Sequence, residues 1–165
     1  MLTIVRETPD RADIHRLLGQ ADARSAALYP AESRFGATAA ELILQNVRFF
    51  LARDFGTAVG CGGFVVGADR CGELKRVFVI PEARGRSIGR RIVEAVEHAA
   101  RAEHVPTLLI ETGVASVEAL SLYRRLGYAE RGPFWSYGSD PLSVFLEKPL
   151  TRSQPPPSVA APVAP

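Results

Sequence analysis

The 165-residue sequence predicts a single α/β domain over residues 1–150, with about seven strands and about four helices. Three observations support this prediction. Apolar runs of strand length alternate with longer amphipathic runs of helix length. Turn-forming glycines and prolines separate these runs. An apolar content of 47% is enough to form one hydrophobic core in a chain of this size.

The N-terminal part of the sequence predicts one strand and two helices. Residues 2–7 alternate between apolar and polar side chains, which is typical of a half-buried strand. Asp10 can cap a helix that ends before Pro30. Thr38 is followed three residues later by Glu41, and this capping-box pattern predicts a short second helix.

The middle of the sequence predicts three strands joined by two hairpins. Residues 47–53 and 58–66 flank a turn that contains Gly56, and residues 67–72 lead into a strand at 73–80. The second of these strands contains three glycines. They indicate a bulge, or a place where another group approaches the backbone closely.

The C-terminal part predicts two further helices and three further strands. A long helix follows residue 87, and its buried stripe is Ile88, Ile92, Val93, Val96 and Ala100. Residues 107–112 are apolar throughout, as in a central strand. Ser116 can cap the last helix, which Gly127 ends. Strands near Tyr128 and at 142–147 complete the domain, and the proline-rich residues 151–165 are predicted to be a disordered tail.

Composition excludes several classes of protein. The 20 basic and 18 acidic residues give a net charge of only +2, so no nucleic-acid partner is predicted. Cys61 and Cys71 are too few for a disulfide framework and have no partners at metal-ligand spacing, so we expect free thiols and no metal. The sequence has neither a signal peptide nor an apolar run long enough to span a membrane, which predicts a cytoplasmic protein.

The segment Arg84-Gly-Arg-Ser-Ile-Gly-Arg90 lies between an apolar strand and an amphipathic helix. The first turn of a helix has unpaired N–H groups and the positive end of the helix dipole, and small residues let a phosphate approach the backbone. The spacing is neither that of a dinucleotide-binding G-x-G-x-x-G nor that of a P-loop. The segment therefore predicts an anion site for another kind of phosphate ligand.

Two motifs in this part of the chain resemble those of one enzyme family. Arg84-x-x-Ser87-x-Gly89 resembles the Q/R-x-x-G-x-G/A acyl-CoA pyrophosphate loop of the GNAT (GCN5-related) N-acetyltransferases. Residues 119–128 resemble the A-x-x-x-Y-x-x-x-G-F/Y signature of the fourth helix in that family. The resemblance covers roughly residues 2–149. The chain departs from the pattern at Ser87, where the family usually has glycine, and at Ser116, where many members have asparagine.

The resemblance implies a fold and a co-substrate. The implied GNAT fold has a mixed, mostly antiparallel sheet that splays between its fourth and fifth strands to hold acyl-CoA. Acetyl-CoA is then the expected co-substrate, with the backbone of Val77 to Val79 pairing with its pantetheine arm and stabilising an oxyanion. The residues expected to contact the cofactor are Val77, Phe78, Val79, Arg84, Gly85, Arg86, Ser87, Ile88, Gly89, Arg90, Ser116 and Tyr123. Ser87 can still offer its N–H group if it adopts helical dihedral angles.

Two residues are candidates for proton transfer. Tyr123 is the candidate acid, because a phenol stays protonated at neutral pH and can donate to a leaving thiolate; core packing is the alternative role. Glu73 is the candidate base by its spacing along the strand before the loop, as in the histone acetyltransferases of the family. A solvated Glu73, deprotonation through water, and Glu111 as the base are the alternatives.

Two loop segments are candidates for the acceptor pocket. Residues 132–145 resemble the G-P-F-x-x-Y-x-x-D-P-x-S-V-F run of a small bacterial GNAT subgroup, and residues 28–33 follow the first helix. Aromatic and acidic side chains in such loops suit a cationic acceptor. The alternative is a rigid connection held by Asp140. The residues expected to bind the acceptor are Tyr29, Glu32, Glu111, Trp135, Tyr137 and Asp140.

Together these features predict an acetyl-CoA-dependent N-acetyltransferase that acts on the primary amine of a small molecule or amino acid. Direct attack on the thioester is expected, because neither cysteine lies in a motif that would activate it. The rival functions are acetylation of a protein N-terminus or lysine, and CoA binding without turnover. The identity of the acceptor and the formation of a homodimer are left open by the sequence.

Overall fold

A computed structural model describes residues 1–150; the predicted tail at 151–165 lies outside the described residues. The elements, in chain order, are β1 (Leu2–Arg6), α1 (Ala12–Leu28), η1 (Ala31–Ser33), α2 (Ala39–Leu44), β2 (Arg48–Asp54), β3 (Thr57–Val66), β4 (Gly72–Val79), η2 (Pro81–Ala83), α3 (Ile88–Ala102), β5 (Thr107–Gly113), α4 (Val117–Arg125), β6 (Ala129–Arg131) and β7 (Ser143–Pro149). The predicted α/β fold is confirmed.

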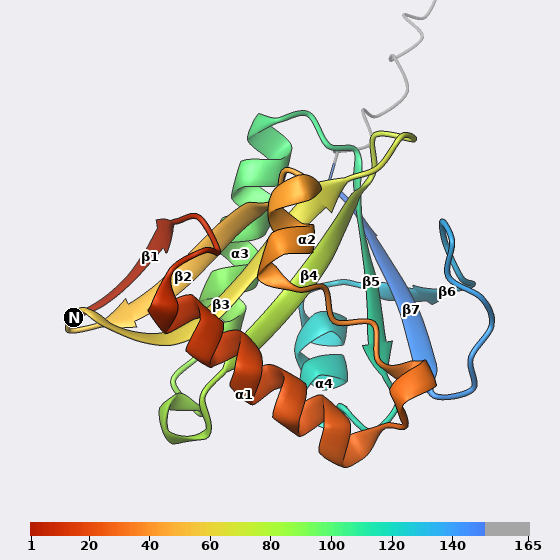
Figure 1. Cartoon of the computed structure of the whole chain (residues 1–165). Helices are drawn as coiled ribbons and strands as arrows, with labels where there is room; N and C mark the ends of the chain where they lie inside the picture. The colour runs from red at the N-terminus through yellow and green to blue at the C-terminus, as the bar shows by residue number, and fades with distance from the viewer. Residues whose placement is uncertain (151–165) are drawn as a thin grey trace, which may run out of the picture.

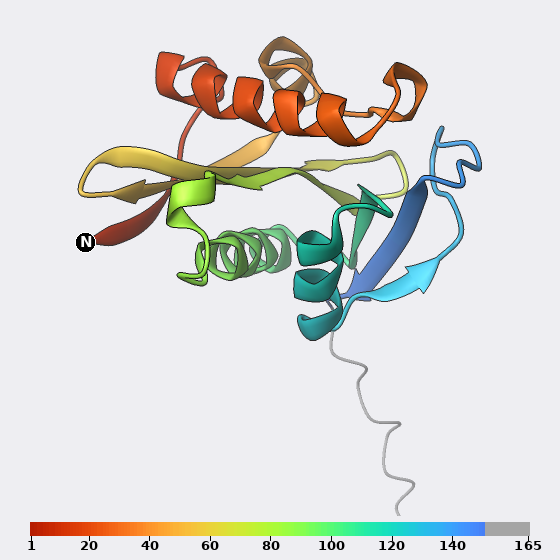
Figure 2. The same cartoon turned by 90° about the horizontal axis from the view of Figure 1, so that it is seen from below.

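The sheet has seven strands in the order β1-β2-β3-β4-β5-β7-β6 (Figure 1). Every neighbouring pair is antiparallel except β4 and β5, which are parallel. Figure 2 shows α1 and α2 on one face of the sheet and α3 and α4 on the other. The site therefore lies in a three-layer arrangement in which two different helix pairs approach the central strands from opposite sides.

Each face of the sheet has its own hydrophobic core, because successive strand residues point to opposite faces. On the α3 side, Leu74, Leu108 and Ile110 pack against Val93 and Val96 of α3. On the α1 side, the core consists of Ile14, Leu17, Leu18, Ala37, Ala39, Leu42, Phe49, Leu51, Ala58, Cys61 and Phe78. Each fully buried leucine or phenylalanine contributes about 2 kcal/mol to the free energy of unfolding.

The parallel pairing of β4 with β5 is very short. It joins only Gly72 to Leu108 and Glu73 to Leu109, and beyond these residues the two strands separate. The predicted splay between the fourth and fifth strands is therefore present. One edge of β4 after Glu73 is left without a neighbouring strand over the described residues.

A bulge in β4 changes which side chains share a face. The register with β3 shifts between Cys61 and Gly63, and Arg76 has a positive φ of 59°. Bulged strands place one extra residue opposite a single partner, which reorients the side chains around it. As a result Arg76 lies on the α1 side, where its Nη1 is 2.8 Å from Asp22.

The helix ends confirm one predicted cap and correct two. Thr38 and Glu41 form the predicted capping box, with bonds of 2.7 and 3.2 Å. Asp10 does not cap α1: the N-cap is Arg11, and Asp10 instead accepts a bond from the Thr8 hydroxyl. Ser116 is the N-cap of α4, but its hydroxyl makes no cap bond. In both cases the capping side chain is engaged by another hydroxyl group.

None of the helices within residues 1–150 combines the length and the apolar character needed to cross a lipid bilayer.

A buried ionic cluster joins α3 to β7. Glu97 is only 4% exposed and is contacted at 2.8 and 3.0 Å by the Lys148 ammonium group. The Tyr128 hydroxyl donates to the same carboxylate at 3.1 Å, and Arg101 lies 3.3 Å from it. The cluster holds Lys148 of β7, and Tyr128 in the segment after α4, against α3.

Removing one partner of this cluster should destabilise the fold. We expect Lys148→Met to lower the free energy of unfolding by about 3 kcal/mol, because it leaves a buried carboxylate with less compensation. The double variant Glu97→Leu with Lys148→Met should lose less than the sum of the single changes. Urea unfolding of the four proteins measures this coupling. Additive losses would show that the pair makes no net contribution.

Candidate active site

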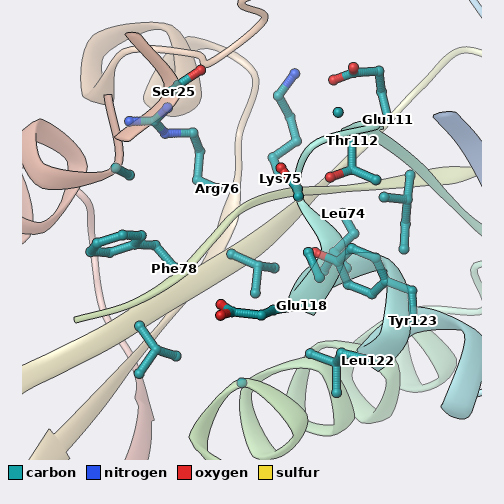
Figure 3. A pocket seen from close by; sticks show the side chains of 18 of the residues that line it. Ser25, Leu74, Lys75, Arg76, Phe78, Glu111, Thr112, Glu118, Leu122 and Tyr123 are labelled. Atoms are coloured by element: carbon teal, nitrogen blue, oxygen red, sulfur yellow. The ribbon is translucent and has the colours of Figure 1, made fainter. Parts of the chain in front are cut away.

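A cleft of about 890 Å³ occupies the space where β4 and β5 separate. Figure 3 shows Tyr123, Leu122 and Glu118 of α4 on one side of the cleft, and Lys75 and Arg76 of β4 on the other. The first turn of α3 and its preceding loop line one end. The C-terminal half of α1 and the segment after η1 line another part of the cleft. The cleft thus passes between the two helix layers through the split in the sheet.

The exposed edge of β4 forms one wall of the cleft. Val77, Phe78 and Val79, the residues predicted to pair with the pantetheine arm, all line the cleft. A strand edge without a neighbour presents N–H and C=O groups that can pair with an extended ligand. The Val79 carbonyl accepts a 3.2 Å bond from Nε of Arg84, which ties the following loop to the end of this strand.

The loop before α3 has the geometry of an anion site. Gly85 and Ser87 both have positive φ, at 76° and 58°. The first helical hydrogen bond runs from Arg91 N to Ser87 O, so the N–H groups of residues 88–90 precede the intrahelical bonding pattern. Ser87 adopts left-handed helical angles, which explains why a glycine is usual at this position.

The arginines of the loop have different roles. Arg84 lines the cleft, and its Nη1 lies 3.9 Å from Glu118. Arg90 also lines the cleft and is paired with Glu94 at 2.7 Å. Arg86 is not among the residues that line the cleft; it pairs with Asp54 at 2.7 Å. Arg86 therefore anchors the loop to the end of β2, and its contact with the cofactor stays a prediction.

Gly89 provides a close approach between α3 and α4. A Cβ atom at this position would lie 3.3 Å from Leu122 Cδ2. A small residue therefore lets the first turn of α3 reach the cleft beside α4, where Gly85, Ser87 and Ile88 also line the wall.

Tyr123 both packs in the core and lines the cleft. It is 5% exposed and makes an edge contact with Tyr128, with ring centroids 5.8 Å apart. Burial, with the charge of Glu111 as a smaller cause, raises the pKa of its phenol well above the ordinary value. The phenol is therefore protonated at neutral pH. The two roles proposed from the sequence are compatible with each other.

Glu73 is buried rather than solvated, with only 4% of its surface exposed. The Tyr137 hydroxyl donates to its Oε1, and Lys75 Nζ lies 3.5 Å from its Oε2. The alternative of a solvated side chain at the start of the strand is therefore excluded. Burial is the main cause that raises the pKa of the Tyr137 phenol, and the charge of Glu73 adds to it, so this phenol stays protonated.

Glu111 lies on the same face of the sheet as Glu73. Glu73 is paired with Leu109, and Glu111 follows Leu109 by two residues, so its side chain points the same way. Ser143 donates to its Oε1 at 2.8 Å. Burial is the main cause that raises the pKa of Glu111, and the nearby charge of Glu73 adds to it. The cleft thus contains two carboxylates with different hydrogen-bond partners.

Tyr29 and Ser116 bridge α1 and α4 at the cleft, with their hydroxyl oxygens 2.9 Å apart. A Cβ atom at Gly113 would collide with the Tyr29 hydroxyl, so the glycine makes room for this contact. Ser116, predicted to contact the cofactor, has Tyr29 as its partner in this structure.

Three predicted acceptor contacts lie outside the residues that line the cleft. Glu32 is exposed on η1. Trp135 donates from its indole N–H to Asp69 at 3.0 Å and packs against Gly67 in the β3–β4 connection. Asp140 accepts a 2.8 Å bond from Leu142 N, which is the bracing role considered as the alternative. Trp135 thus fastens the segment 132–142 to the β3–β4 connection, Asp140 closes a local turn within it, and Tyr137 lines the cleft.

Several residues that line the cleft were not singled out from the sequence. Lys75 could have been found, because strand alternation from Glu73 places it on the same face. Phe35 and Arg24 gave no signal of their own, because their positions depend on the packing of α1 and the segment after η1 around the split.

Comparisons with known proteins agree with this geometry. Residues 12–128 match the Acetyltransferase (GNAT) family. The chain is 46% identical over 150 residues to a protein named IAA acetyltransferase from Azospirillum brasilense, covering 90% of this chain and 98% of that relative. Both values indicate similarity over the full domain rather than over one motif.

Two solved structures are similar over almost the whole chain. A proposed acyl-CoA N-acyltransferase from Klebsiella pneumoniae superposes with a TM-score of 0.79 at 38% identity, covering 92% of this chain and 99% of that one. The yncA protein from Salmonella typhimurium, a proposed acetyltransferase solved with acetyl-CoA, has a TM-score of 0.72 at 18% identity; the match covers 96% of this chain and 99% of that one. At this low identity the second match supports the fold alone.

The left-handed conformation of Ser87 leads to a prediction about stability. Ser87→Gly should raise the free energy of unfolding by up to about 1 kcal/mol, because glycine has no Cβ to strain at positive φ. The same change at Ser121, an exposed position inside α4, should instead lower it by about 0.5 kcal/mol. Urea unfolding measures both, and equal effects at the two positions would contradict the strained geometry.

Proposed function

The chain belongs to the acetyltransferase (GNAT) family, and we propose that it transfers an acetyl group from acetyl-CoA to the primary amine of a small molecule by direct attack. The observation that carries this proposal is the split between β4 and β5. It brings an open strand edge, a phosphate-type loop, a protonated phenol, the buried carboxylate of Glu73 and the half-buried carboxylate of Glu111 to one cleft.

The residues along the β4 edge and at the α3 terminus fit the co-substrate. The edge of Val77 to Val79 suits an amide-containing chain, and the free N–H groups of residues 88–90, with Arg84, suit a pyrophosphate. When bound, acetyl-CoA supplies the thioester carbonyl that an amine attacks. A backbone N–H group on β4 would stabilise the oxyanion by about 3 kcal/mol.

A carboxylate on the α1 face of the sheet accepts the proton from the amine. The two oxygens of Glu73 are engaged by Tyr137 and Lys75. Within residues 1–150, Oε2 of Glu111 has no hydrogen-bond partner, and burial raises the pKa of this carboxyl. A carboxylate with a raised pKa is the stronger base while it remains ionised. Glu111 is therefore the better-placed proton acceptor, and Glu73, ranked first from the sequence, is proposed to assist it.

Tyr123 is proposed to return a proton to the leaving thiolate. Its phenol remains protonated because burial opposes ionisation. It approaches the cleft from α4, on the opposite side of the sheet from Glu111. The acid and the base therefore act from opposite faces of the split and do not exchange protons directly.

The cysteines support direct attack rather than a covalent intermediate. Burial raises the pKa of the Cys61 thiol to about 12, so almost no thiolate is present at neutral pH. The pKa of Cys71 is also raised by burial, and neither thiol lines the cleft. The chain therefore offers no activated cysteine near the proposed site of transfer.

The direct test is an acetyl-transfer assay that measures release of free thiol. The panel contains primary amines, amino acids, a lysine-containing peptide and IAA, the compound in the name of the Azospirillum relative. Thiol release that depends on a small amine, with the acetylated amine found by mass spectrometry, is the expected result. Release with the peptide alone would identify a protein acetyltransferase, and tight CoA binding without release would identify a binding module.

Tyr123→Phe should lower kcat by roughly 10²-fold, because the ring keeps its packing while the donating hydroxyl is lost. Binding of CoA, measured by calorimetry, should change little. Tyr128→Phe is the matched control: it also removes a buried hydroxyl next to the same ring, but this hydroxyl points to Glu97. The control should lose stability and keep its kcat. An unchanged kcat for Tyr123→Phe, with chemistry rate-limiting, would leave Tyr123 a packing role only.

Glu111→Gln should lower kcat by roughly 10²-fold and by more than Glu73→Gln does. Although kcat falls, the free energy of unfolding of Glu111→Gln should rise relative to the wild type. Because the folded state raises the pKa of Glu111, the wild type loses stability as pH rises from the ordinary pKa of a glutamate to this raised pKa. Glutamine does not ionise, so the variant should gain stability relative to the wild type over the same interval, measured by urea unfolding at a series of pH values. A larger loss of kcat for Glu73→Gln would make Glu73 the proton acceptor.

A further inference from the structure

We propose that the acceptor is a primary amine with an aromatic side group and no carboxylate. This inference rests on the proposed function and concerns the half of the cleft that faces α1. It is based on which charged side chains in this half of the cleft form ion pairs with each other, and on which apolar side chains remain exposed.

The acceptor half of the cleft has one carboxylate without a cationic partner. Lys75 is paired with Glu73, and Arg76 is paired with Asp22 and also donates to the Leu18 carbonyl at 3.1 Å. Glu111 has only the neutral Ser143 hydroxyl as its partner within residues 1–150. An ammonium group would therefore be attracted, while a carboxylate on the acceptor would be repelled by Glu111 and Glu73.

Four other arginines line the cleft: Arg24, Arg84, Arg90 and Arg125. Arg84 and Arg90 flank the start of α3. Arg24 of α1 lies 3.7 Å from Glu118 of α4, and Arg84 lies 3.9 Å from the same carboxylate. Arg24 and Arg84 therefore share one carboxylate. Arg125 belongs to the last turn of α4, on the opposite face of the sheet from the two acceptor-side carboxylates. The charge available to the acceptor thus remains negative.

Aromatic side chains form the wall next to these carboxylates. Phe35, from the segment after η1, meets Tyr137 edge-on with ring centroids 5.4 Å apart and an interplanar angle of 86°. Both line the cleft, and Tyr137 is hydrogen-bonded to Glu73. Phe35 remains 39% exposed, so a large apolar surface is left uncovered at the entrance. Leu28, at the end of α1, adds further apolar surface.

These surfaces select for the shape and the charge of the acceptor together. An aromatic ring can cover Phe35 while its short amine chain reaches the carboxylate side of the cleft. An aliphatic amine would satisfy the charge but leave the ring uncovered. An aromatic amino acid would cover the ring but carry a carboxylate toward Glu111.

The test compares three probes at saturating acetyl-CoA by kcat/KM for thiol release: phenethylamine, L-phenylalanine and n-butylamine. We expect phenethylamine to exceed each of the other two by at least about tenfold. A kcat/KM for L-phenylalanine that equals or exceeds that for phenethylamine would overturn the exclusion of carboxylates and would indicate that Lys75 binds the carboxylate of the substrate. Equal kcat/KM values for phenethylamine and n-butylamine would overturn the proposed preference for an aromatic acceptor. In both of these cases amine acetylation itself would stand, whereas no turnover with any amine or amino acid would overturn the proposed function as well.

A pair of variants tests the wall independently. Phe35→Ala should lower kcat/KM for phenethylamine about tenfold and change the value for n-butylamine little. Phe55→Ala is the matched control, because Phe55 is 89% exposed in the turn between β2 and β3 and does not line the cleft. It should leave both values unchanged. Parallel losses for both amines in Phe35→Ala would show a structural effect and contradict the proposed contact.

Discussion

The two-residue length of the parallel pairing between β4 and β5 is the constraint on which the site depends. Strands that stop pairing leave backbone groups unsatisfied, and in a buried location this is costly unless something else binds them. The same separation opens a passage between the two faces of the sheet. Residues on the α1 face and residues on the α4 face can then meet one ligand.

The separation is maintained by packing on both sides of the split. On β4 the bulge at Arg76 turns a second cation toward α1 and pairs it with Asp22. On the far side, Glu97 of α3 joins Lys148 of β7 and Tyr128, and Tyr128 packs against Tyr123. The ion cluster is therefore connected to the proposed acid through one aromatic contact, and it contributes to stability on the far side of the split.

Much of the fold could be predicted from the sequence, because it depends on local patterns. The alternation of strand residues and the Thr38 capping box act over a few residues and are found as expected. The features that could not be predicted depend on contacts between distant segments. Ser116 meets Tyr29, Trp135 meets Asp69, and burial of Glu73 requires Tyr137 from the β6–β7 connection. The left-handed angles of Ser87 follow from the path of the loop rather than from its residue type.

The most direct test of the central claim is residue-resolved amide hydrogen exchange with and without acetyl-CoA. If the split holds the co-substrate, backbone amides of β4 beyond Glu73 that face the cleft should exchange rapidly in the free protein. They should become protected on addition of acetyl-CoA, together with amides 88–90 at the start of α3. Amides of β1, an edge strand of the sheet that does not line the cleft, provide the internal reference and should not change. Protection that is absent from β4, or that appears equally at β1, would contradict the assignment of the split as the binding cleft.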